Sequence, residues 1–141
     1  MVKRDYCFEL KSKLSELNTL CKHLEDCGND MELPQKCLFE INLGLDELFT
    51  NIISYGFEDD SEHQIKFYLA KDNETLVVQV EDDGKPFNPL EAAGPEVSPD
   101  LDSVNIGGLG IHLVKKMMDA IDYQRIKGKN RLILKKCVTA V

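Results

Sequence analysis

A carboxylate and an amide stand one helical turn apart in the segment DELFTNII. Glu47 and Asn51 are four residues apart, so both side chains leave a helix on the same side. An amide oxygen is a hard ligand suited to Mg²⁺, and a nearby carboxylate can orient an attacking water or hydroxyl. Polar pairs at this spacing are also common on the exposed edge of a helix. The pair therefore indicates either a metal-and-base site or a solvated helix edge.

A second carboxylate ends a run of alternating apolar residues in the segment VEDDGKPFNP. Asp82 has the same parity as Val78 and Val80, so it continues the apolar face of a strand. A buried carboxylate needs a hydrogen-bond donor, and the exocyclic amine of adenine is one such donor. Gly84 would let the backbone approach a flat ring closely. Asp-Gly is equally typical of an ordinary turn after a strand, so both interpretations stay open here.

The third segment, NIGGLGIHLVKKM, combines glycines with the start of an apolar helix. Gly107, Gly108 and Gly110 expose backbone N–H groups, and a helix N-terminus favours phosphate. Lys115 or Lys116 could reach the same phosphate, or lie on a solvated helix face. The segment is not a Walker loop, because no G-K-[S/T] follows, and it lacks the preceding strand of a dinucleotide fingerprint.

The three segments occur in the order E-x-x-x-N, D-x-G-x-x-F and G-x-G, and together they are far more specific than any one alone. In this order the chain resembles the GHKL superfamily of ATP-binding domains. Within it, the chain is similar to bacterial anti-sigma-factor serine kinases. DELFTNIISYGF resembles their N box, EDDGKPFNP their first glycine box and GGLGIHLVKKMMD their second. The resemblance extends to the final GKNRLILKK and implies one ATP-binding domain over residues 1–141.

The resemblance implies a role for each motif residue. Glu47 would be the general base, and Asn51 would bind the Mg²⁺ that bridges the phosphates of ATP. Asp82 would accept a hydrogen bond from the adenine amine, with Gly84 beneath the ring. Residues from about 88 to 107 would form a lid over the nucleotide. The remaining nucleotide-binding residues would be Phe87, Gly107, Gly108, Leu109 and Gly110, with the amides of Gly108 and Gly110 on the phosphates.

Three positions depart from the pattern of the family. Ile133 is assigned to the place where many relatives carry a Thr that helps to hold adenine through water. Tyr55 stands where His is frequent, and Asn88 stands where Asp is frequent. None of these departures removes the metal ligand or the base.

The resemblance further implies a Mg-ATP-dependent serine kinase that phosphorylates a small antagonist protein, binds a sigma factor and forms a homodimer. A serine hydroxyl must lose its proton as it attacks, which suits Glu47 as a base. A histidine kinase would need a phospho-accepting His on a dimerising pair of helices, whereas His23 lies on a single short predicted helix. Two alternatives stay open: a module that binds ATP and sequesters a regulator without chemistry, and a free-standing ATPase.

Apolar periodicity predicts the elements that must position these motifs. The predicted order is strand, helix, helix, strand, strand, loop, helix, strand, strand. This order indicates an α+β two-layer sandwich, with helices packed on one face of a mainly antiparallel mixed sheet. The resemblance implies that this sandwich is the histidine-kinase-like ATPase fold. The predicted strands are 6–10, 63–70, 75–82, 120–126 and 130–136, with turns at 71–74 and at Gly128. The predicted helices run through Leu10, Leu14, Leu17, Cys21 and Leu24 to a stop at 27–29, then over 35–54, and then from the glycines at 107–110 onward.

Composition limits the possible partners. The chain carries 17 basic and 25 acidic residues, a net charge of −8, which disfavours binding to nucleic acid. No apolar run approaches the roughly 18 residues that span a membrane, and the N-terminus is not of signal-peptide type, so a cytoplasmic protein is expected. Five cysteines without a C-x-x-C pair predict reduced, mostly buried thiols rather than a zinc site or disulfides.

Overall fold

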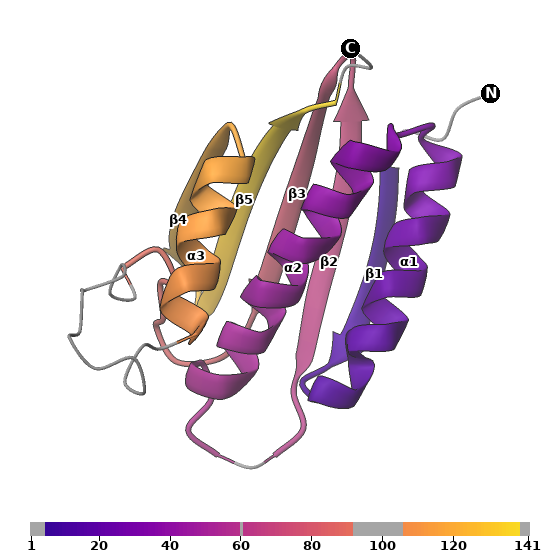
Figure 1. Ribbon diagram of the computed structural model, residues 1–141. Helices are drawn as coiled ribbons and strands as arrows, with labels where there is room; N and C mark the ends of the chain where they lie inside the picture. Colours follow the sequence, from indigo (N-terminus) through magenta and orange to yellow (C-terminus); the bar gives the residue numbers. More distant parts are fainter. Residues whose placement is uncertain (1–4, 60, 92–105, 139–141) are drawn as a thin grey trace.

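The computed structural model describes residues 5–59, 61–91 and 106–138, with only the backbone of 106–110. Five strands form one sheet in the order β1-β2-β3-β5-β4, and every pairing among them is antiparallel. The helices cover one face of this sheet (Figure 1), which confirms the predicted two-layer α+β sandwich. The strands are β1 (Asp5–Lys11), β2 (Gln64–Asp72), β3 (Thr75–Asp82), β4 (Ala120–Ile126) and β5 (Lys129–Cys137). The helices are a 3₁₀ turn (Leu14–Glu16), α1 (Leu17–Asp30), α2 (Gln35–Tyr55) and α3 (Ile106–Met117).

The core lies between the helices and the inner face of the sheet. Alternate strand residues point into it, so β3 buries Leu76, Val78 and Val80 in one row. Helix α2 is central and buries residues along most of its length, including Leu45, Leu48, Phe49 and Ile52. This extensive burial agrees with the apolar residues that its sequence carries on several sides.

The first helix was predicted wrongly at both ends. Leu10 lies in β1, where it is buried by strand alternation, and α1 begins only at Leu17. At the other end α1 continues past Gly28 to Asp30. A Cβ at Gly28 would lie 2.8 Å from Cδ2 of Leu38, so this glycine lets α1 and α2 pack closely rather than ending the helix.

The two hairpin turns match the prediction closely. Strand β2 extends to Asp72, and Asn73 then turns the chain with φ of 56°. Between β4 and β5 the turn is made by Lys127 and Gly128, with φ of 51° and 78°. A positive φ is most easily adopted by glycine, as expected at position 128.

The cysteines and the helices test two expectations from composition: mostly buried thiols and the absence of a membrane-spanning segment. All five cysteines carry thiols and none is in a disulfide, but only Cys27 and Cys37 are buried, so the prediction of mostly buried thiols was wrong. Cys7 and Cys137 are exposed because, by strand alternation, they have the opposite parity to the buried residues of β1 and β5. Among the described helices, none is both long and apolar enough to cross a membrane.

The motif-bearing ends of three elements meet at one end of the molecule. Figure 1 shows the end of α2, the end of β3 and the beginning of α3 at this end. Helix α3 packs on α2, where Gly44 faces Val114 and Met118. The fold therefore brings the three sequence motifs into one region.

Candidate functional site

Glu47 and Asn51 form a hydrogen-bonded pair on α2. Asn51 is only 3% exposed, which rules out the exposed-edge interpretation for this residue. Its Nδ2 donates to the backbone oxygen of Glu47 at 2.8 Å and to Oε1 of Glu47 at 3.1 Å. Both of these bonds use Nδ2, so the amide is held in one orientation and Oδ1 is the atom left to accept from or ligate a further group.

Asp82 is buried at the end of β3, as its parity predicts, and is 5% exposed. Its Oδ1 accepts from the backbone N–H of Gly84 at 2.9 Å and from Nδ2 of Asn130 at 3.0 Å. Burial raises the pKa of this carboxyl, while the bonds from Asn130 and Gly84 partly oppose the rise. Because both bonds end on Oδ1, Oδ2 is the oxygen left for a ligand donor.

Gly84 is required by the packing of its own backbone. A Cβ at this position would lie 2.3 Å from the backbone oxygen of Gly56 and 3.0 Å from Oδ1 of Asp82. The next residue, Lys85, donates its backbone N–H to the same Gly56 oxygen at 2.9 Å. The end of β3 is thereby fastened to the residue that follows α2. The predicted approach of Gly84 to a flat ring stays a prediction.

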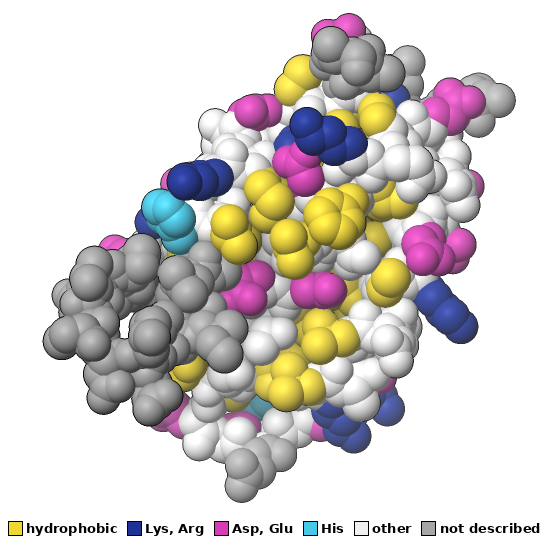
Figure 2. Space-filling model, viewed as in Figure 1, with side chains coloured by type: hydrophobic (Ala, Val, Ile, Leu, Met, Phe, Trp, Pro, Cys, Tyr) yellow, Lys and Arg dark blue, Asp and Glu magenta, His cyan; other side chains and the backbone are white. Residues whose placement is uncertain are grey.

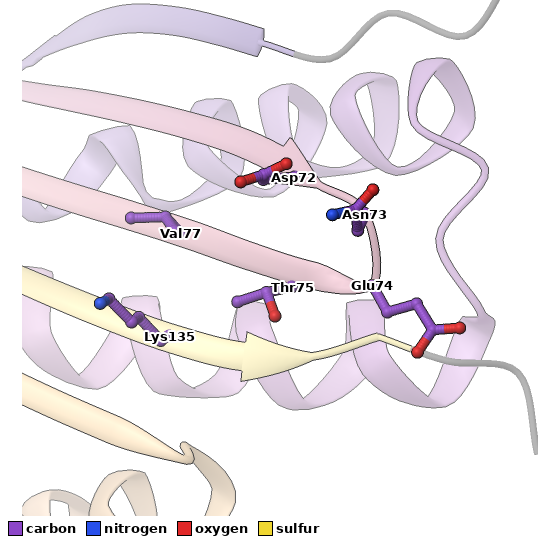
Figure 3. A pocket seen from close by; sticks show the side chains of 6 residues that line it. All are labelled: Asp72, Asn73, Glu74, Thr75, Val77 and Lys135. Carbon is purple, nitrogen blue, oxygen red and sulfur yellow. The ribbon is translucent and has the colours of Figure 1, made fainter.

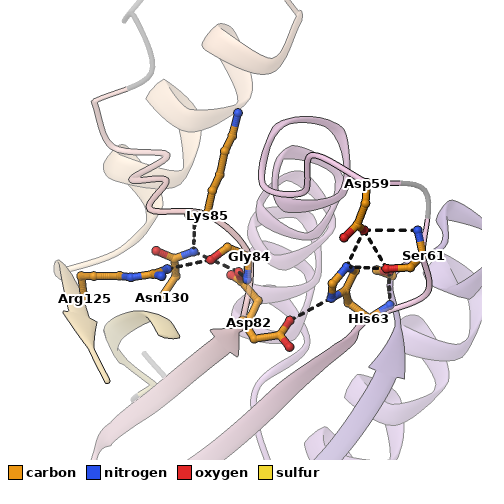
Figure 4. A network of polar contacts seen from close by, with 10 residues as sticks. Asp59, Ser61, His63, Asp82, Gly84, Lys85, Arg125 and Asn130 are labelled. Carbon is orange, nitrogen blue, oxygen red and sulfur yellow. Dashed lines mark hydrogen bonds and ion pairs between the residues drawn. The ribbon is translucent and has the colours of Figure 1, made fainter. Parts of the chain in front are cut away.

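Asn130 is the residue that sequence reasoning missed. It is 2% exposed and lies directly opposite Asp82 in the β3–β5 pairing. Besides Asp82, its Nδ2 donates to the backbone oxygen of Lys85 at 2.7 Å, as Figure 4 shows. Its Oδ1 accepts from the backbone N–H of Phe87 at 3.2 Å and from the hydroxyl of Tyr123. Asn130 therefore holds the whole D-x-G-x-x-F segment in place.

A signal for Asn130 was present in the sequence. It shares the parity of the buried residues Leu132 and Leu134, so it continues an apolar strand face as Asp82 does. Strand parity also shows that the assignment of Ile133 to the adenine pocket was wrong. Ile133 has the opposite parity and pairs with Gln79 on the outer face of the sheet.

The residues that follow Asp82 reach the start of the predicted lid. The ring of Phe87 lies 6.1 Å from that of Tyr55 at the end of α2. Asn88 accepts the backbone N–H of Leu90 at 3.0 Å, and Lys115 donates from α3 to the backbone oxygen of Leu90 at 3.0 Å. Lys115 therefore links α3 to this segment. Neither interpretation from the sequence, a phosphate contact or a solvated helix face, included this contact.

The glycine-rich segment forms the first turns of α3. Gly107, Gly108, Leu109 and Gly110 all have helical backbone, and Ile111 directly after them is buried. The predicted lid, about 88–107, is described only at its two ends, and residues 92–105 lie outside the described residues. The placement of these glycines at the beginning of a helix agrees with the sequence, and their contact with phosphate stays a prediction.

A hollow of about 840 Å³ lies away from these residues. It surrounds the β2–β3 turn (Figure 3). This turn leads into β3 at Thr75, whereas Asp82 is at the other end of that strand. Among the described residues that line it, Asp72 and Glu74 are acidic and Lys135 is the single cation, a poor setting for a polyanion. Neither Glu47 nor Asn51 lines it.

The family follows from comparison with known proteins. Residues 10–136 match the family model of the histidine kinase-like ATPase domain. The chain belongs to this family. It is 31% identical over 96 residues to the serine/threonine-protein kinase BtrW of Bordetella bronchiseptica, covering 68% of each chain. It is 32% identical over 89 residues to the serine-protein kinase RsbW of Listeria monocytogenes, but spans only about half, 55%, of that kinase.

Solved structures of low sequence identity share the fold. The RsbU and RsbW domains of a Mycobacterium tuberculosis protein superpose with a TM-score of 0.68 at 12% identity, covering 99% of this chain and 34% of that one. A blue-light activated histidine kinase of Erythrobacter litoralis gives a TM-score of 0.59 at 17% identity, covering 88% of this chain and 41% of that one. These likenesses support the fold alone.

The residues of this family member fit the nucleotide that a kinase-like ATPase domain uses. The oriented Oδ1 of Asn51 has the hardness that Mg²⁺ requires of a ligand. The remaining oxygen of Asp82 can accept the amine of adenine in a buried position. Backbone amides at the start of α3 suit phosphate oxygens. Donor chemistry, orientation and burial are therefore compatible with Mg-ATP.

Proposed function

We propose that this chain is a Mg-ATP-dependent serine protein kinase of the anti-sigma-factor type. The observation that carries the proposal is the Asn51–Glu47 hydrogen bond, which orients a metal-ligating amide beside a carboxylate base. Buried Asp82 supplies the acceptor for adenine. It is the last residue of β3, which ends at the same end of the molecule as α2. The names of the BtrW and RsbW relatives, both serine kinases, support the choice of a hydroxyl acceptor.

The chemistry assigned to the chain is proton transfer and positioning. Glu47 takes the proton of the attacking serine hydroxyl as the new oxygen–phosphorus bond forms and the bond from the γ-phosphorus to ADP breaks. Asn51 would hold Mg²⁺ through Oδ1, and the metal would offset negative charge on the phosphates. Asp82 fixes the base of the nucleotide, while Gly108 and Gly110 present backbone amides to its phosphates. Few side chains are needed, because phosphoryl transfer depends mainly on alignment and charge neutralisation.

The proposed partners are a small antagonist protein as phosphate acceptor and a sigma factor as binding partner, with both interactions in the cytoplasm. We propose a homodimer in which β1 contributes to the interface. This strand lies at one edge of the described sheet, and an edge strand offers backbone N–H and C=O groups for pairing with another chain.

A single-turnover assay tests the proposal directly. The chain is mixed with γ-labelled Mg-ATP and a candidate antagonist protein, and label on serine is measured. Glu47→Gln is expected to abolish transfer while ATP binding is retained, because the variant keeps the shape of the base but cannot accept the proton. Glu74→Gln, in the exposed β2–β3 turn away from the candidate site, is the matched control and should transfer normally.

Other outcomes of the assay would favour the alternatives. ATP binding without transfer to any protein would support a sequestering module. Steady release of phosphate without a protein acceptor would support a free-standing ATPase. Full transfer by the Glu47→Gln variant would remove Glu47 from the role of base.

A further inference from the structure

His63 bridges two segments that belong to different halves of the candidate site. It lies at the end of the connection from α2 to β2, and its Nε2 is 2.7 Å from Oδ1 of Asp59 in the same connection. Its Nδ1 is 3.1 Å from Oδ1 of Asp83, the residue next to the adenine acceptor Asp82. Figure 4 shows the imidazole between these contacts. Its ring also stacks on Phe57, with centroids 4.3 Å apart.

The two segments touch at further points beyond His63. Gly84 packs on the oxygen of Gly56, which also accepts the N–H of Lys85. The Lys85 ammonium lies 3.9 Å from a carboxylate oxygen of Glu58. A hollow of about 160 Å³, lined by Glu58, Asp59, His63, Asp83, Gly84 and others, marks the joint. Helix α2 carries Asn51, and β3 carries Asp82. The connection that follows α2 is therefore fastened to the turn that follows β3.

The protonation state of the imidazole decides whether both of its contacts with aspartate are hydrogen bonds. An imidazolium donates from both ring nitrogens, whereas a neutral imidazole donates from one only. His63 has a carboxylate acceptor at each nitrogen, so only its charged form can satisfy both Asp59 and Asp83. The Ser61 hydroxyl also lies 3.0 Å from Nε2, and at 2.7 Å it can donate to Asp59. It cannot replace the bond to Asp83 on the other side of the ring.

We propose that His63 is a pH-sensitive latch, which joins the adenine side of the nucleotide site to its metal side when protonated and loosens that joint when neutral. Loosening frees the carboxylate of Asp83 and removes one of the contacts that hold the adjoining Asp82–Gly84 turn. The latch would thus tune nucleotide affinity with pH. This coupling rests on the proposed function, whereas the titration of the joint itself does not.

The surrounding charges favour the protonated form. The hydrogen bond to Asp59 is the largest cause of the raised pKa of His63; burial opposes it, and the hydrogen bond to Asp83 and the charges of both aspartates add to the rise. Glu58 and Lys85 also line the hollow, and their opposite charges pair with each other. Neighbouring Glu62 is occupied by Lys11 and Lys13. The net field at the ring is therefore set by the two aspartates.

The sign of the effect follows from the direction of this shift. A raised folded-state pKa means that the folded chain binds the proton more tightly than the unfolded chain. The stabilisation is fully present below the unfolded value of about 6.5 and is lost as pH rises through the higher folded value. Stability should therefore fall between pH about 6.5 and the folded pKa of His63.

The first experiment measures the latch without nucleotide. NMR titration of the intact chain should give His63 a pKa above that of a free histidine. Asp83→Asn should move it down and leave the resonance of exposed His112 unchanged. Urea unfolding at several pH values should show the wild type losing stability relative to His63→Gln as pH rises. A His63 pKa at or below the ordinary value, or parallel pH curves for the two proteins, would overturn the latch.

The second experiment measures the coupling to nucleotide. Affinity for Mg-ATP is determined at pH 6 and pH 8.5 for wild type and His63→Gln, so that the variant corrects for titration of ATP itself. The ratio of wild-type to variant affinity should fall severalfold at the higher pH. Binding with a constant ratio would overturn the coupling but leave the proposed function standing. Absence of binding by either protein at both pH values would overturn the proposed function and the coupling together.

Discussion

Replacing Asn130 by alanine is expected to break the network that holds the turn after β3. The side chain makes two donor and two acceptor contacts in a position only 2% exposed. Its bond to Asp82 has a charged acceptor and is worth about 1.5–3 kcal/mol, and each neutral bond about 1 kcal/mol. These bonds share one network, so they do not add fully. We expect a loss of about 3 kcal/mol in the free energy of unfolding.

Urea unfolding followed by circular dichroism measures this loss. Tyr123→Phe is the matched control, since it removes one hydroxyl from the network while Asn130 keeps its bonds to Asp82, Lys85 and Phe87. It should cost about 1 kcal/mol. Under conditions where Asn130→Ala remains folded, its affinity for Mg-ATP should also fall, because Asp82 loses the donor that directs Oδ2 outward. A loss of less than about 1 kcal/mol in unfolding free energy, close to that of an ordinary surface change, would refute the reasoning.

Further predictions concern the same turn. Gly84→Ala should destabilise the chain by about 1–3 kcal/mol in urea unfolding, since its Cβ would meet the rigid backbone of Gly56 at 2.3 Å. Gly44→Ala is the control and should cost far less, because its Cβ would meet only the flexible tip of Met118, at 3.1 Å. Asp82→Asn should weaken ATP binding by about 1–3 kcal/mol by calorimetry, because an amide can place a donor opposite the adenine amine; unchanged affinity would remove adenine from the role of Asp82. In the wild type, protonation of Asp82 should weaken nucleotide binding to a similar extent, at a pH above the ordinary Asp value of about 3.9, because burial raises the pKa of Asp82. The same shift should make unfolding free energy fall as pH rises through that pKa, and the Asp82→Asn variant should lack this slope.

Local patterns predicted much of the fold because they are short-range. Strand alternation located β2 to β5 to within about two residues, and helical periodicity located α2. The error at Leu10 arose because a residue four positions before Leu14 fits a helical pattern as well as a strand pattern. Gly28 was misplaced because a glycine near a helix end serves equally to end the helix or to admit a neighbour. Only the contact with Leu38 separates those two cases.

The candidate site was predicted one residue at a time, without the contacts that hold it together. Parity placed Asp82 on an inner face, and spacing placed Glu47 and Asn51 on one side of a helix. Asn130 carried the same parity signal as Asp82, but no motif drew attention to it. His63 was not singled out, because its partner Asp83 lies 20 residues away and comes within reach only once two distant segments meet.

The amino-acid sequence alone determined which residue types could bind a metal, a purine and phosphates, because those properties belong to the side chains and to their spacing along single elements. The antiparallel pairing of β3 with β5 decided that Asn130 lies against Asp82, 48 residues away along the chain. Packing of Gly84 on Gly56 decided how the metal side meets the adenine side. These choices depend on register and close approach between distant segments, which arise from burying the common core rather than from any local pattern.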